Sequence, residues 1–523
     1  MFASAALAQD IGSMAAQLAS GDRKQARAAI EQLGSSEHPA ALTILQALEQ
    51  RQLRASDSGQ LFVQDAERGV LLDPISGKPV TAPAGVKKVA VTNAIRRALK
   101  SALARQQLGS EDRIVRRAAA EVLAKSPSAD MGDTIRDALG TESDFQTREM
   151  LSVALAQIDL ESDNRTLRLA AVKTIGDVGE LSLKPKLETM VKQGADGGYG
   201  ETDEGVRKEA RKALSALERK EFFVRIVRDL FYGLSLGSVL LLAALGLAIT
   251  FGLMGVINMA HGEMLMLGAY SAFVVQGIFQ KHLPAAFDWY IVAAIPVAFI
   301  VCFLVGVLLE RTVIRFLYGR PLETLLATWG ISLIIIQTVR MIFGAQNVTV
   351  ANPSWLSGGY ELVPGVVLPY ARLATMIFVA AVVAFVWYLL NRTNLGLQVR
   401  AITQNRTMAR AMGIRTSRVD MLTFGLGSAV AGLGGVALSQ LGNVGPELGQ
   451  GYIVDSFMVV VVGGVGEIAG TVVAALGLGT VNKILEPVSG AVLGKIFVLG
   501  FIILFIQRRP QGLFALKGRA AES

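Results

Sequence analysis

Three residues with polar or ionisable side chains interrupt an otherwise apolar stretch of the sequence. Asn258, His261 and Glu263 lie within FGLMGVINMAHGEMLMLGAY, residues 251–270. Ionisable groups within a bilayer are costly, and they usually face a cavity, a partner or a water-filled path. The segment therefore predicts a polar passage through a membrane. In the alternative interpretation, Asn258 and His261 cap broken helices.

A second apolar stretch, residues 323–343, contains further hydrogen-bonding groups. Thr328 and Ser332 are four residues apart, so they share a face of the predicted helix. Gln337 and Arg340 follow on the same span. Six residues are thus candidates for the polar passage: Asn258, His261, Glu263, Thr328, Ser332 and Gln337.

The remaining motifs do not form a catalytic constellation. GLSLG, residues 233–237, matches a nucleophile elbow, but it opens a predicted transmembrane helix, whereas the elbow needs a strand, a turn and a helix. The sequence has no Walker-type phosphate-binding loop, so the chain does not bind ATP in that way. Cys302 is the only cysteine, and the three histidines are too scattered for a zinc motif. We therefore expect no enzyme activity, no cofactor and no metal.

Composition divides the 523 residues into two parts. Charged residues are frequent from Arg23 to Lys220, whereas the sequence becomes largely apolar after Phe222. A polar domain therefore precedes a membrane domain over residues 221–523. The formal net charge is +8, but much of the excess Arg lies in short loops between apolar spans, where it sets topology. We expect a lipid bilayer, and no nucleic acid, as a partner.

The first residues, MFASAALAQD, contain an Ala-Leu-Ala sequence that resembles a signal-peptide cleavage site. No basic region and no full apolar region precede it, so it is either the remnant of a truncated signal peptide or a chance match. In the first interpretation, residues 1–8 are the remnant and residues 9–220 are an exported domain.

The polar domain contains a repeated helical pattern. DRIVRRAAAEVL, NRTLRLAAVKTI and DEGVRKEARKAL begin at Asp112, Asn164 and Asp203, and a weaker copy begins at Asp22. Each has an acidic or amide N-cap, then Arg and an Ala-rich helix, and each Arg is interpreted as solvated or ion-paired. Self-similar helical units predict an α-solenoid of HEAT-like repeats that buries its core by stacking. Turn and β-type residues predict a small β-hairpin insert near residues 59–80.

The second half of the chain contains eight candidate membrane spans, since a span needs roughly 20 apolar residues. They lie at about residues 226–252, 256–279, 289–309, 323–343, 371–390, 421–441, 453–485 and 489–507. The Arg-rich loops at residues 310–320 and 391–418 are assigned to the cytoplasm, and counting back from them places the polar domain outside. A break within VVGGVGEIAG, residues 461–470, would let the seventh stretch cross twice. The sequence thus predicts about eight or nine spans.

The second Arg-rich loop also contains a short amphipathic helix. Val399, Ile402, Ala409 and Met412 fall on one helical face of LQVRAITQNRTMARAM, and Gly413 follows as the residue that ends the helix. This helix either rests on lipid headgroups or docks onto a cytoplasmic partner.

Five motifs occur in order over residues 226–515. They are FGLMGVINMAHGEMLMLGAY, LLERTVIRFLYGRPLETLLATWGISLIIIQ, LGLQVRAITQNRTMARAMGIRTSRVDMLTFGLGSAVAGLGGV, VVVVGGVGEIAGTVVAALGLG and RRPQGLF. Together they resemble the permeases of ABC importers of the branched-chain amino-acid type. The helical-repeat extension ahead of them resembles the permease subunit of urea transporters. Met259 and the EIAG tetrapeptide, residues 467–470, depart from the usual family pattern, which is compatible with a substrate other than a branched-chain amino acid.

The resemblance implies an all-α permease of the bacterial inner membrane. It also implies partners: a second homologous permease subunit, two cytoplasmic ATPase subunits and a periplasmic substrate-binding protein. The loop helix around Arg400, Ala401, Asn405, Ala409 and Gly413 would be the coupling helix on an ATPase subunit. The resemblance of the extension to that of urea transporters makes urea the favoured substrate, and a polar pore would replace the hydrogen bonds that urea loses with water. A branched-chain amino acid or a short amide is the alternative.

Two other classes of protein share some of these features. A passive amide channel would need the same polar lining but no ATPase, and the coupling-type loop argues against it. A membrane-anchored scaffold would not need polar residues buried in its spans.

Overall fold

The computed structural model describes residues 13–514, except residues 15, 19–21, 37, 57–59, 66–69, 82–85, 195–196 and 364–365. The predicted signal-peptide remnant, residues 1–8, lies outside the described residues. The chain divides into two compact units, Met1–Phe222 and Phe223–Ser523, close to the join that composition predicts at residue 220. Helix α10, Glu204–Leu247, contains residues of both units.

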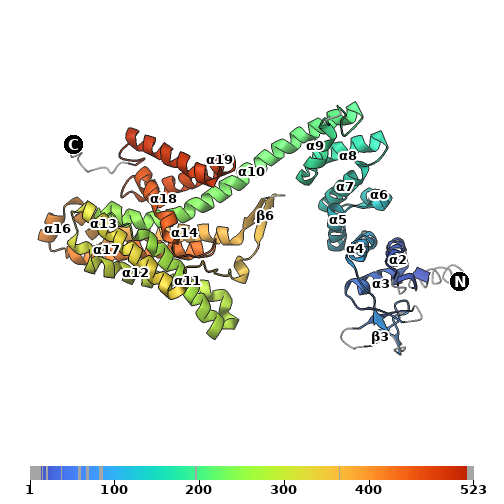
Figure 1. Ribbon diagram of the computed structural model, residues 1–523, viewed down its shortest axis with the longest axis horizontal. Coiled ribbons are helices and arrows are strands. Elements are labelled where there is room, and N and C mark those ends of the chain that lie inside the picture. Colours follow the sequence, from blue (N-terminus) through green and yellow to red (C-terminus); the bar gives the residue numbers. More distant parts are fainter. Residues whose placement is uncertain are drawn as a thin grey trace. The chain divides into compact units, whose positions relative to one another are not determined.

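The first unit is built mainly from short helices that pack on their neighbours in the sequence (Figure 1). Helix α5 packs on α4 and α7, and α7 packs on α8. Small side chains such as Ala119, Ala120 and Ala154 are buried there, which lets the helices approach closely. The helices are α2 (Arg23–Ser35), α3 (Pro39–Glu49), α4 (Asn93–Gln107), α5 (Arg113–Lys125), α6 (Gly132–Thr141), α7 (Phe145–Asp159), α8 (Arg165–Val178), α9 (Lys184–Val191) and the start of α10, with 3₁₀ turns η1 (Ala129–Met131) and η2 (Leu181–Leu183).

The predicted N-caps of the repeated helices are confirmed. Each cap residue accepts a hydrogen bond from an amide in the first turn of its helix, which satisfies a donor that the helix itself leaves free. The pairs are Asp22 with Lys24, Asp112 with Ile114, Asn164 with Thr166, and Asp203 with Val206, at 2.8–3.0 Å.

The Arg that follows two of these caps is ion-paired. Arg116 Nε contacts Glu142 at 2.9 Å, and its Nη1 donates to two backbone carbonyls of the preceding loop. Arg168 pairs with Glu201 in the same way, also at 2.9 Å. The glutamate side chains are only 3% and 5% exposed. Each Arg therefore ties the loop before its own helix to a loop that precedes a later helix.

Lowering the pH is expected to destabilise the first unit through these pairs. The Arg116 guanidinium holds the pKa of Glu142 below its usual range. Burial raises the pKa of Glu201, but hydrogen bonds from Arg168 and from the Asp203 amide outweigh burial and leave this pKa lowered. Carboxylates of this kind stabilise the fold above their unfolded pKa of about 4.3. That stabilisation is lost as the pH falls through the folded pKa.

Glu142→Gln should cost the first unit about 3 kcal/mol, because it leaves Arg116 without its charged partner. It should also weaken the pH dependence. Proteolysis of the first unit in the purified full chain, followed from about pH 7 to about pH 3, measures both effects. Glu121→Gln is the matched control, since Glu121 is 53% exposed in its pair with Lys125 and exposed pairs contribute little. Equal protease resistance of the Glu142→Gln and parent chains would contradict the prediction.

The β insert is larger than the predicted hairpin, but strands remain few and the predicted all-α class fits the chain. Its five antiparallel strands have the order β4-β3-β2-β1-β5. β1 and β5 lie outside the predicted range and are too short to show an alternating pattern. β1 is held in place because Leu53 packs in the same core as α2, α3 and α4. The strands are β1 (Leu53–Ala55), β2 (Leu61–Gln64), β3 (Leu71–Leu72), β4 (Pro79–Val80) and β5 (Lys87–Lys88).

The second unit is a bundle of apolar helices. Seven helical segments in the described part of the chain are long and apolar enough to cross a membrane: Glu204–Leu253, His261–His282, Pro284–Phe316, Pro321–Phe343, Tyr370–Arg392, Thr416–Ser439 and Ile468–Pro487. A shorter apolar helix, Leu448–Gly463, accompanies them. The loop after the fourth segment contains a second, unpredicted hairpin of β6 (Gly359–Val363) and β7 (Val366–Pro369).

The elements of this unit follow the predicted order of spans. They are the end of α10, the π-helical turn η3 (Ala248–Leu253), α11 (His261–His282), η4 (Pro284–Trp289), α12 (Tyr290–Thr312), η5 (Ile314–Phe316), α13 (Pro321–Phe343), η6 (Ser354–Leu356), α14 (Tyr370–Arg392), α15 (Asn394–Gln404), α16 (Arg406–Ala411), α17 (Thr416–Ser439), α18 (Leu448–Gly463) and α19 (Ile468–Arg508). Short loops join most of them, so neighbouring helices run in opposite directions (Figure 1).

Helix α17 lies at the centre of the helix packing in this bundle. It packs most extensively on α11 and α12, and 89% of its apolar 18-residue stretch is buried. Glycines make these contacts close: a Cβ on Gly435 would collide with the Leu265 carbonyl of α11, and a Cβ on Gly432 with Cys302 of α12. The predicted role of the Gly-rich sequence in close helix packing is therefore confirmed.

The GLSLG motif, residues 233–237, also serves helix packing. It lies inside α10, where a Cβ on Gly233 would meet the backbone of Thr480 in α19, and a Cβ on Gly237 would meet that of Ala475. The motif thus has no strand–turn–helix context and is not a nucleophile elbow.

The predicted break between residues 461 and 470 is confirmed. Helix α18 ends at Gly463, and α19 begins at Ile468. Between them, Gly464 and Gly466 have φ angles of 102° and 91°, which residues with a side chain rarely adopt. The chain therefore turns sharply at this point.

Helix α19 reverses direction within its own length. Gly490 has a φ of 76° and interrupts the helical backbone. The Leu513 amide, beyond the end of α19, donates to the Val462 carbonyl, before its start, at 2.8 Å. Both ends of α19 therefore reach the same turn, and the helix forms a hairpin.

Candidate functional site

The polar segment predicted from the sequence joins the first two spans of the membrane unit. The turn η3 ends at Leu253, and α11 begins at His261. Gly255 has a φ of 70°, so a glycine is needed where the chain turns. Asn258 Oδ1 accepts a hydrogen bond from the Ala260 amide at 3.0 Å, just before α11. This oxygen of Asn258 therefore has a structural role in the turn before α11, whose N-cap residue is Ala260 and which is not capped by a side chain.

Two hydrogen bonds fasten the segment to α13. The Met259 amide donates to Thr328 Oγ1 at 3.0 Å, and Ser332 Oγ donates to Glu263 Oε1 at 2.9 Å. Glu263, Thr328 and Ser332 are all buried. The structure thus brings the predicted face of α13 onto the polar segment.

His261 fastens the segment to α10. Its Nε2 lies 2.9 Å from the Ala243 carbonyl, and because a carbonyl only accepts, Nε2 is the protonated ring nitrogen. The ring is fully buried and lies against Gly246, where a Cβ would meet Cε1. The other ring nitrogen, Nδ1, is left as an acceptor.

Three atoms of the segment are buried without a hydrogen-bond partner among the described residues. They are Asn258 Nδ2, His261 Nδ1 and Glu263 Oε2. Most buried polar groups in folded proteins are paired, with protein or with ordered water, because an unpaired one is costly. Three such atoms within six residues indicate that the segment binds water or a polar solute.

Gln337 does not join this cluster. It lies five residues after Ser332 and is exposed, so it projects from a different face of α13. Most other side chains of α13 are also partly or fully exposed. The structure therefore brings five of the six candidate residues together, namely Asn258, His261, Glu263, Thr328 and Ser332.

The predicted loop helix is two helices, α15 and α16. Asn405 between them has an extended backbone, with φ −152° and ψ 100°, and its side chain accepts a hydrogen bond from the Met408 amide at 2.8 Å. Asn is a strong N-cap residue, so it ends one helix and starts the next. Gly413 follows α16 with a φ of 87°, which confirms its predicted role at the helix end.

The apolar face of this loop packs on the membrane unit, so in this structure that face is not presented to a partner. Val399, Ile402 and Ala409 are buried in one cluster with Val419 of α17. Met412, by contrast, is 77% exposed, because the break at residue 405 changes the helical phase.

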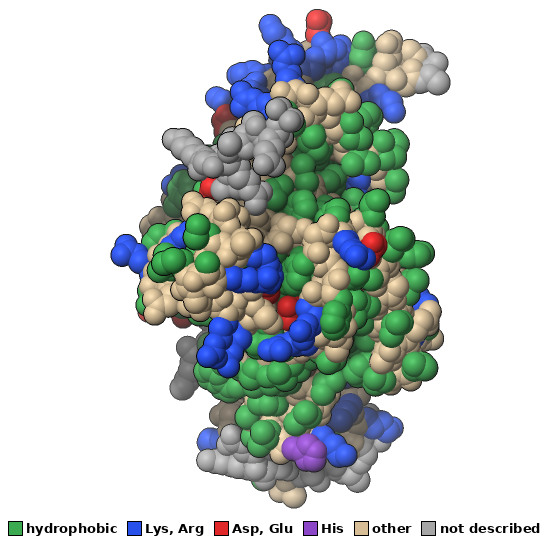
Figure 2. All heavy atoms as spheres, turned by 90° about the vertical axis from the view of Figure 1, so that its left-hand side faces the viewer, with side chains coloured by type: hydrophobic (Ala, Val, Ile, Leu, Met, Phe, Trp, Pro, Cys, Tyr) green, Lys and Arg blue, Asp and Glu red, His purple; other side chains and the backbone are tan. Residues whose placement is uncertain are grey.

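The remaining coupling candidates differ in exposure. Ala401 is half-buried, whereas Arg400, Asn405 and Gly413 are exposed. Met408 and Met412 are also exposed, at 60% and 77%. Figure 2 shows the end of the membrane unit where α16 lies, with Lys and Arg side chains standing among hydrophobic ones. An exposed surface of two Met side chains within a basic loop is thus available to a partner.

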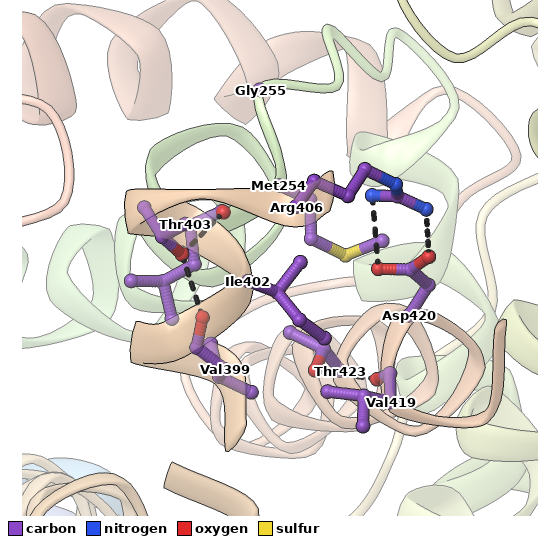
Figure 3. A pocket seen from close by; sticks show the side chains of 10 residues that line it. Met254, Gly255, Val399, Ile402, Thr403, Arg406, Val419, Asp420 and Thr423 are labelled. Carbon is purple, nitrogen blue, oxygen red and sulfur yellow. Dashed lines mark hydrogen bonds and ion pairs between the residues drawn. The ribbon is translucent and has the colours of Figure 1, made fainter. Parts of the chain in front are cut away.

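A small cavity of about 180 Å³ lies between α15, α16, α17 and the residues after η3 (Figure 3). Arg406 of α16 forms an ion pair with Asp420 of α17 at one side of it. At the other side, Thr403 Oγ1 donates to the Leu253 carbonyl at 3.0 Å. The cavity therefore lies beside the start of the polar segment.

A larger cavity of about 1460 Å³ lies between α10, α14, α15 and α19. Most of its lining is apolar. Its polar lining includes Asn391, Arg400, Thr403 and Gln404, near α15, and Glu467 in the turn before α19. The cavity was not predicted from the sequence, because helices from three separate stretches of the chain enclose it. Of its polar lining, Arg400 had been singled out as a coupling candidate and Glu467 as part of the unusual EIAG tetrapeptide.

The fold and the buried polar segment together define the class of the protein, a multi-span helical membrane transport subunit. Residues 230–506 match the family described as "Branched-chain amino acid transport system / permease component", and the chain belongs to this family.

Similar proteins match part of the chain. The branched-chain amino acid permease protein BraD of Pseudomonas aeruginosa is 28% identical over 293 residues, which is 55% of this chain and 95% of that protein. LivH of Escherichia coli K12 is 29% identical over 303 residues, 56% of this chain and 96% of that protein. The ribose import permease RbsC of Bacillus subtilis is 33% identical over 135 residues, 24% of this chain and 42% of that protein. No solved structure matches the chain.

Proposed function

We propose that the protein is the permease subunit of an ATP-driven importer for a small polar solute, and that this solute is urea. The observation that supports the proposal is the set of unpartnered polar atoms in the buried segment Asn258–Glu263. In a permease, this segment would line part of the path along which the solute loses its water.

The unpartnered atoms match urea in type. Asn258 Nδ2 is a donor for a carbonyl oxygen, whereas His261 Nδ1 and an ionised Glu263 Oε2 are acceptors for N–H groups. Urea has one carbonyl and two NH₂ groups, so it needs both kinds of partner. The carboxylate of an amino acid would call for a basic side chain, and the segment Asn258–Glu263 contains no Lys or Arg. The resemblance of the N-terminal helical repeats to the extension of urea-transporter permeases also favours urea.

A branched-chain amino acid is the second candidate substrate. BraD and LivH are named as branched-chain amino acid permeases, and both align along nearly their whole length. The largely apolar cavity of about 1460 Å³ would accommodate an aliphatic side chain. A short amide is a third candidate, for the same reason as urea.

We assign the partners from the family. They are a second homologous permease subunit, two cytoplasmic ATPase subunits and a periplasmic substrate-binding protein. The exposed Met408 and Met412 of the basic loop are the proposed contact with an ATPase subunit. The first unit, residues 9–220, would be an exported HEAT-like repeat domain, and its stacked helices and repeated Arg–Glu pairs support this assignment.

The proposed location is the bacterial inner membrane, with the first unit in the periplasm. The Arg-rich loops assign each helix end to one side of the membrane. Contacts between different helices join ends that are assigned to the same side, which supports this assignment. Arg340 pairs with Glu447 at 2.5 Å at the outer ends of α13 and α18, and Thr403 bonds to Leu253 at the inner end of α10. With α18 and each half of α19 counted as one crossing, the number of helical crossings is odd, which supports a cytoplasmic position for the basic C-terminus.

A reporter fused after Lys192 is expected to lie outside the cytoplasm. Alkaline phosphatase, which needs an oxidising compartment, and a cytoplasmic fluorescent protein are the two complementary reporters. Fusion after Arg415 gives the opposite control. Cytoplasmic signal at both positions would contradict the span count and the export of the first unit.

Uptake of radiolabelled urea and leucine tests the substrate. A deletion strain complemented with this gene and its neighbouring transport genes should take up urea, and the uptake should stop when ATP is depleted. Uptake of leucine alone would select the second candidate. Urea entry that persists without ATP would identify a passive channel. Normal uptake of both solutes in the absence of the gene would favour the membrane-anchored scaffold.

A further inference from the structure

The pair of helices α15 and α16 is fastened to the membrane bundle by two polar contacts in addition to its apolar packing. Thr403 Oγ1 of α15 lies 3.0 Å from the Leu253 carbonyl and 2.8 Å from the Val399 carbonyl of its own helix, so its single proton is shared between the two acceptors. Arg406 of α16 forms an ion pair with Asp420 in the first turns of α17. Figure 3 shows Thr403 and the Arg406–Asp420 pair on opposite sides of the small cavity. We refer to the contact between Thr403 and Leu253 as the threonine contact and to the Arg406–Asp420 pair as the arginine contact.

The arginine contact reaches three elements of the bundle. The Asp420 side chain is 4% exposed, so its charge depends on Arg406 for compensation. The Arg406 guanidinium also lies over the Tyr318 ring, 4.7 Å from its centre. The Tyr318 hydroxyl in turn donates to Glu310 of α12 at 3.4 Å. A displacement of α16 would therefore pull on α17 and, through Tyr318, on α12.

The threonine contact reaches the polar segment. Leu253 is the last residue of η3 and lies only five residues before Asn258. Further along, Val256 is buried against Ile314 and Phe424, and the Met259 amide bonds to Thr328 of α13. Gly255, between these points, has the positive φ that lets the chain turn. A displacement of α15 is thus transmitted along a short segment to the unpartnered atoms.

The surroundings of the two contacts are incompletely packed. Leu253, Val399 and Thr403 line both the cavity of about 180 Å³ and the cavity of about 1460 Å³, so they form the wall between them. A cavity removes the dispersion contacts that would otherwise hold α15 against the bundle. The polar contacts consequently account for more of the connection than they would in a close-packed interface.

We propose that Thr403 and Arg406 are positioning residues that transmit movement of α15 and α16 to the polar segment Leu253–Glu263 and to α17. This inference rests on the proposed function, in which an ATPase subunit moves the α15–α16 pair. Neither residue touches the solute in this proposal. Their loss would leave ATP hydrolysis intact while separating it from transport.

The experiment compares two single variants with matched controls in the complex of the full chain with its ATPase subunits. Thr403→Val removes the hydroxyl without changing the side-chain shape, and Arg406→Ala removes the ion pair. Thr338→Val and Arg418→Ala are the controls, since both residues are exposed and neither takes part in the two contacts. The exchange of charges in Arg406→Asp with Asp420→Arg tests whether a restored ion pair restores coupling.

Two readouts separate coupling from folding. The first is urea imported per ATP hydrolysed in proteoliposomes with the binding protein, which should fall about fivefold or more in both variants, the lower end of typical coupling effects. The second is hydrogen exchange of residues 253–263, which should change when a non-hydrolysable ATP analogue is added to the parent complex but not to the variant complexes. A residue needed only for folding would lower the yield of complex and leave both readouts unchanged. The charge-exchanged chain should regain at least half of the parent ratio.

The outcomes distinguish this inference from the proposed function. A parent chain that captures no ATPase contradicts the proposed function and the inference with it. A parent complex that hydrolyses ATP, with Thr403→Val and Arg406→Ala as tightly coupled as the parent in the exchange readout, contradicts the inference alone. If Arg406→Ala yields no complex, Thr403→Val decides the result, because it removes a single oxygen from a half-buried site.

Discussion

Asn258→Leu is expected to leave the protein in the membrane and to abolish most of its substrate uptake. The change removes the amide nitrogen that is buried without a partner, and it leaves the Ala260 amide without its hydrogen-bond acceptor. Loss of one such hydrogen bond costs about 2 kcal/mol, which is about a 30-fold fall in the rate of uptake. Initial rates with radiolabelled urea and leucine, at matched amounts of membrane protein, measure the effect.

Asn258→Ser separates the two roles of this residue. The Ser hydroxyl can still accept a hydrogen bond from the Ala260 amide, but the side chain has no amide nitrogen to offer a carbonyl oxygen. If the amide contacts the solute, the Ser variant should be inserted normally and transport poorly. Full uptake by Asn258→Ser would show that Asn258 has only a structural role.

Replacing Met408 and Met412 together by Asp should release the ATPase subunit from the permease. Both side chains are exposed, so the folded chain tolerates the charges, whereas an interface would bury them. An unpaired charge buried in an interface costs about 3 kcal/mol, which weakens binding by about 100-fold. The amount of ATPase that co-purifies with the tagged permease measures this loss.

The matched control is the double change of Met408 and Met412 to Leu, which keeps an apolar surface of similar volume and should retain the ATPase. Ala409→Trp is a contrasting change. Ala409 is buried against the membrane unit, so an indole there should reduce the amount of folded permease, since overpacking costs about 1–3 kcal/mol. ATPase binding that survives both Asp substitutions would place the contact elsewhere on the loop.

The parts of the fold that sequence analysis predicted correctly are those with a local cause. N-caps at Asp112 and Asn164, glycines in α17 and the break before Ile468 each follow from a residue's own chemistry or from its near neighbours. The sheet around β1 was larger than expected because its edge strands are too short to show a period. Asn405 was overlooked as a cap because apolar spacing continued across it and suggested a single helix.

The candidate site was predictable in its residues and not in its connections. An amide, an imidazole and a carboxylate in an apolar stretch are visible in any reading of the sequence. The contact of His261 with the Ala243 carbonyl is not, because a backbone atom leaves no trace in the sequence. Gln337 was included in the polar path because of its side-chain type. Its position along α13 puts it on a different face of the helix from Thr328 and Ser332. Arg406 and Asp420 lie 14 residues apart, and their pairing depends on a turn between two helices.

The central position of α17 constrains how the protein is made. Ribosomes deliver the chain from its N-terminus, so α11 and α12 enter the membrane well before residues 416–439 exist. The glycine contacts that α17 makes with both helices cannot form until then, whereas α11 and α12 can already pack on each other. The bundle is therefore completed late in synthesis, when the sixth span inserts, and a chain truncated before residue 416 would lack the helix around which the others assemble.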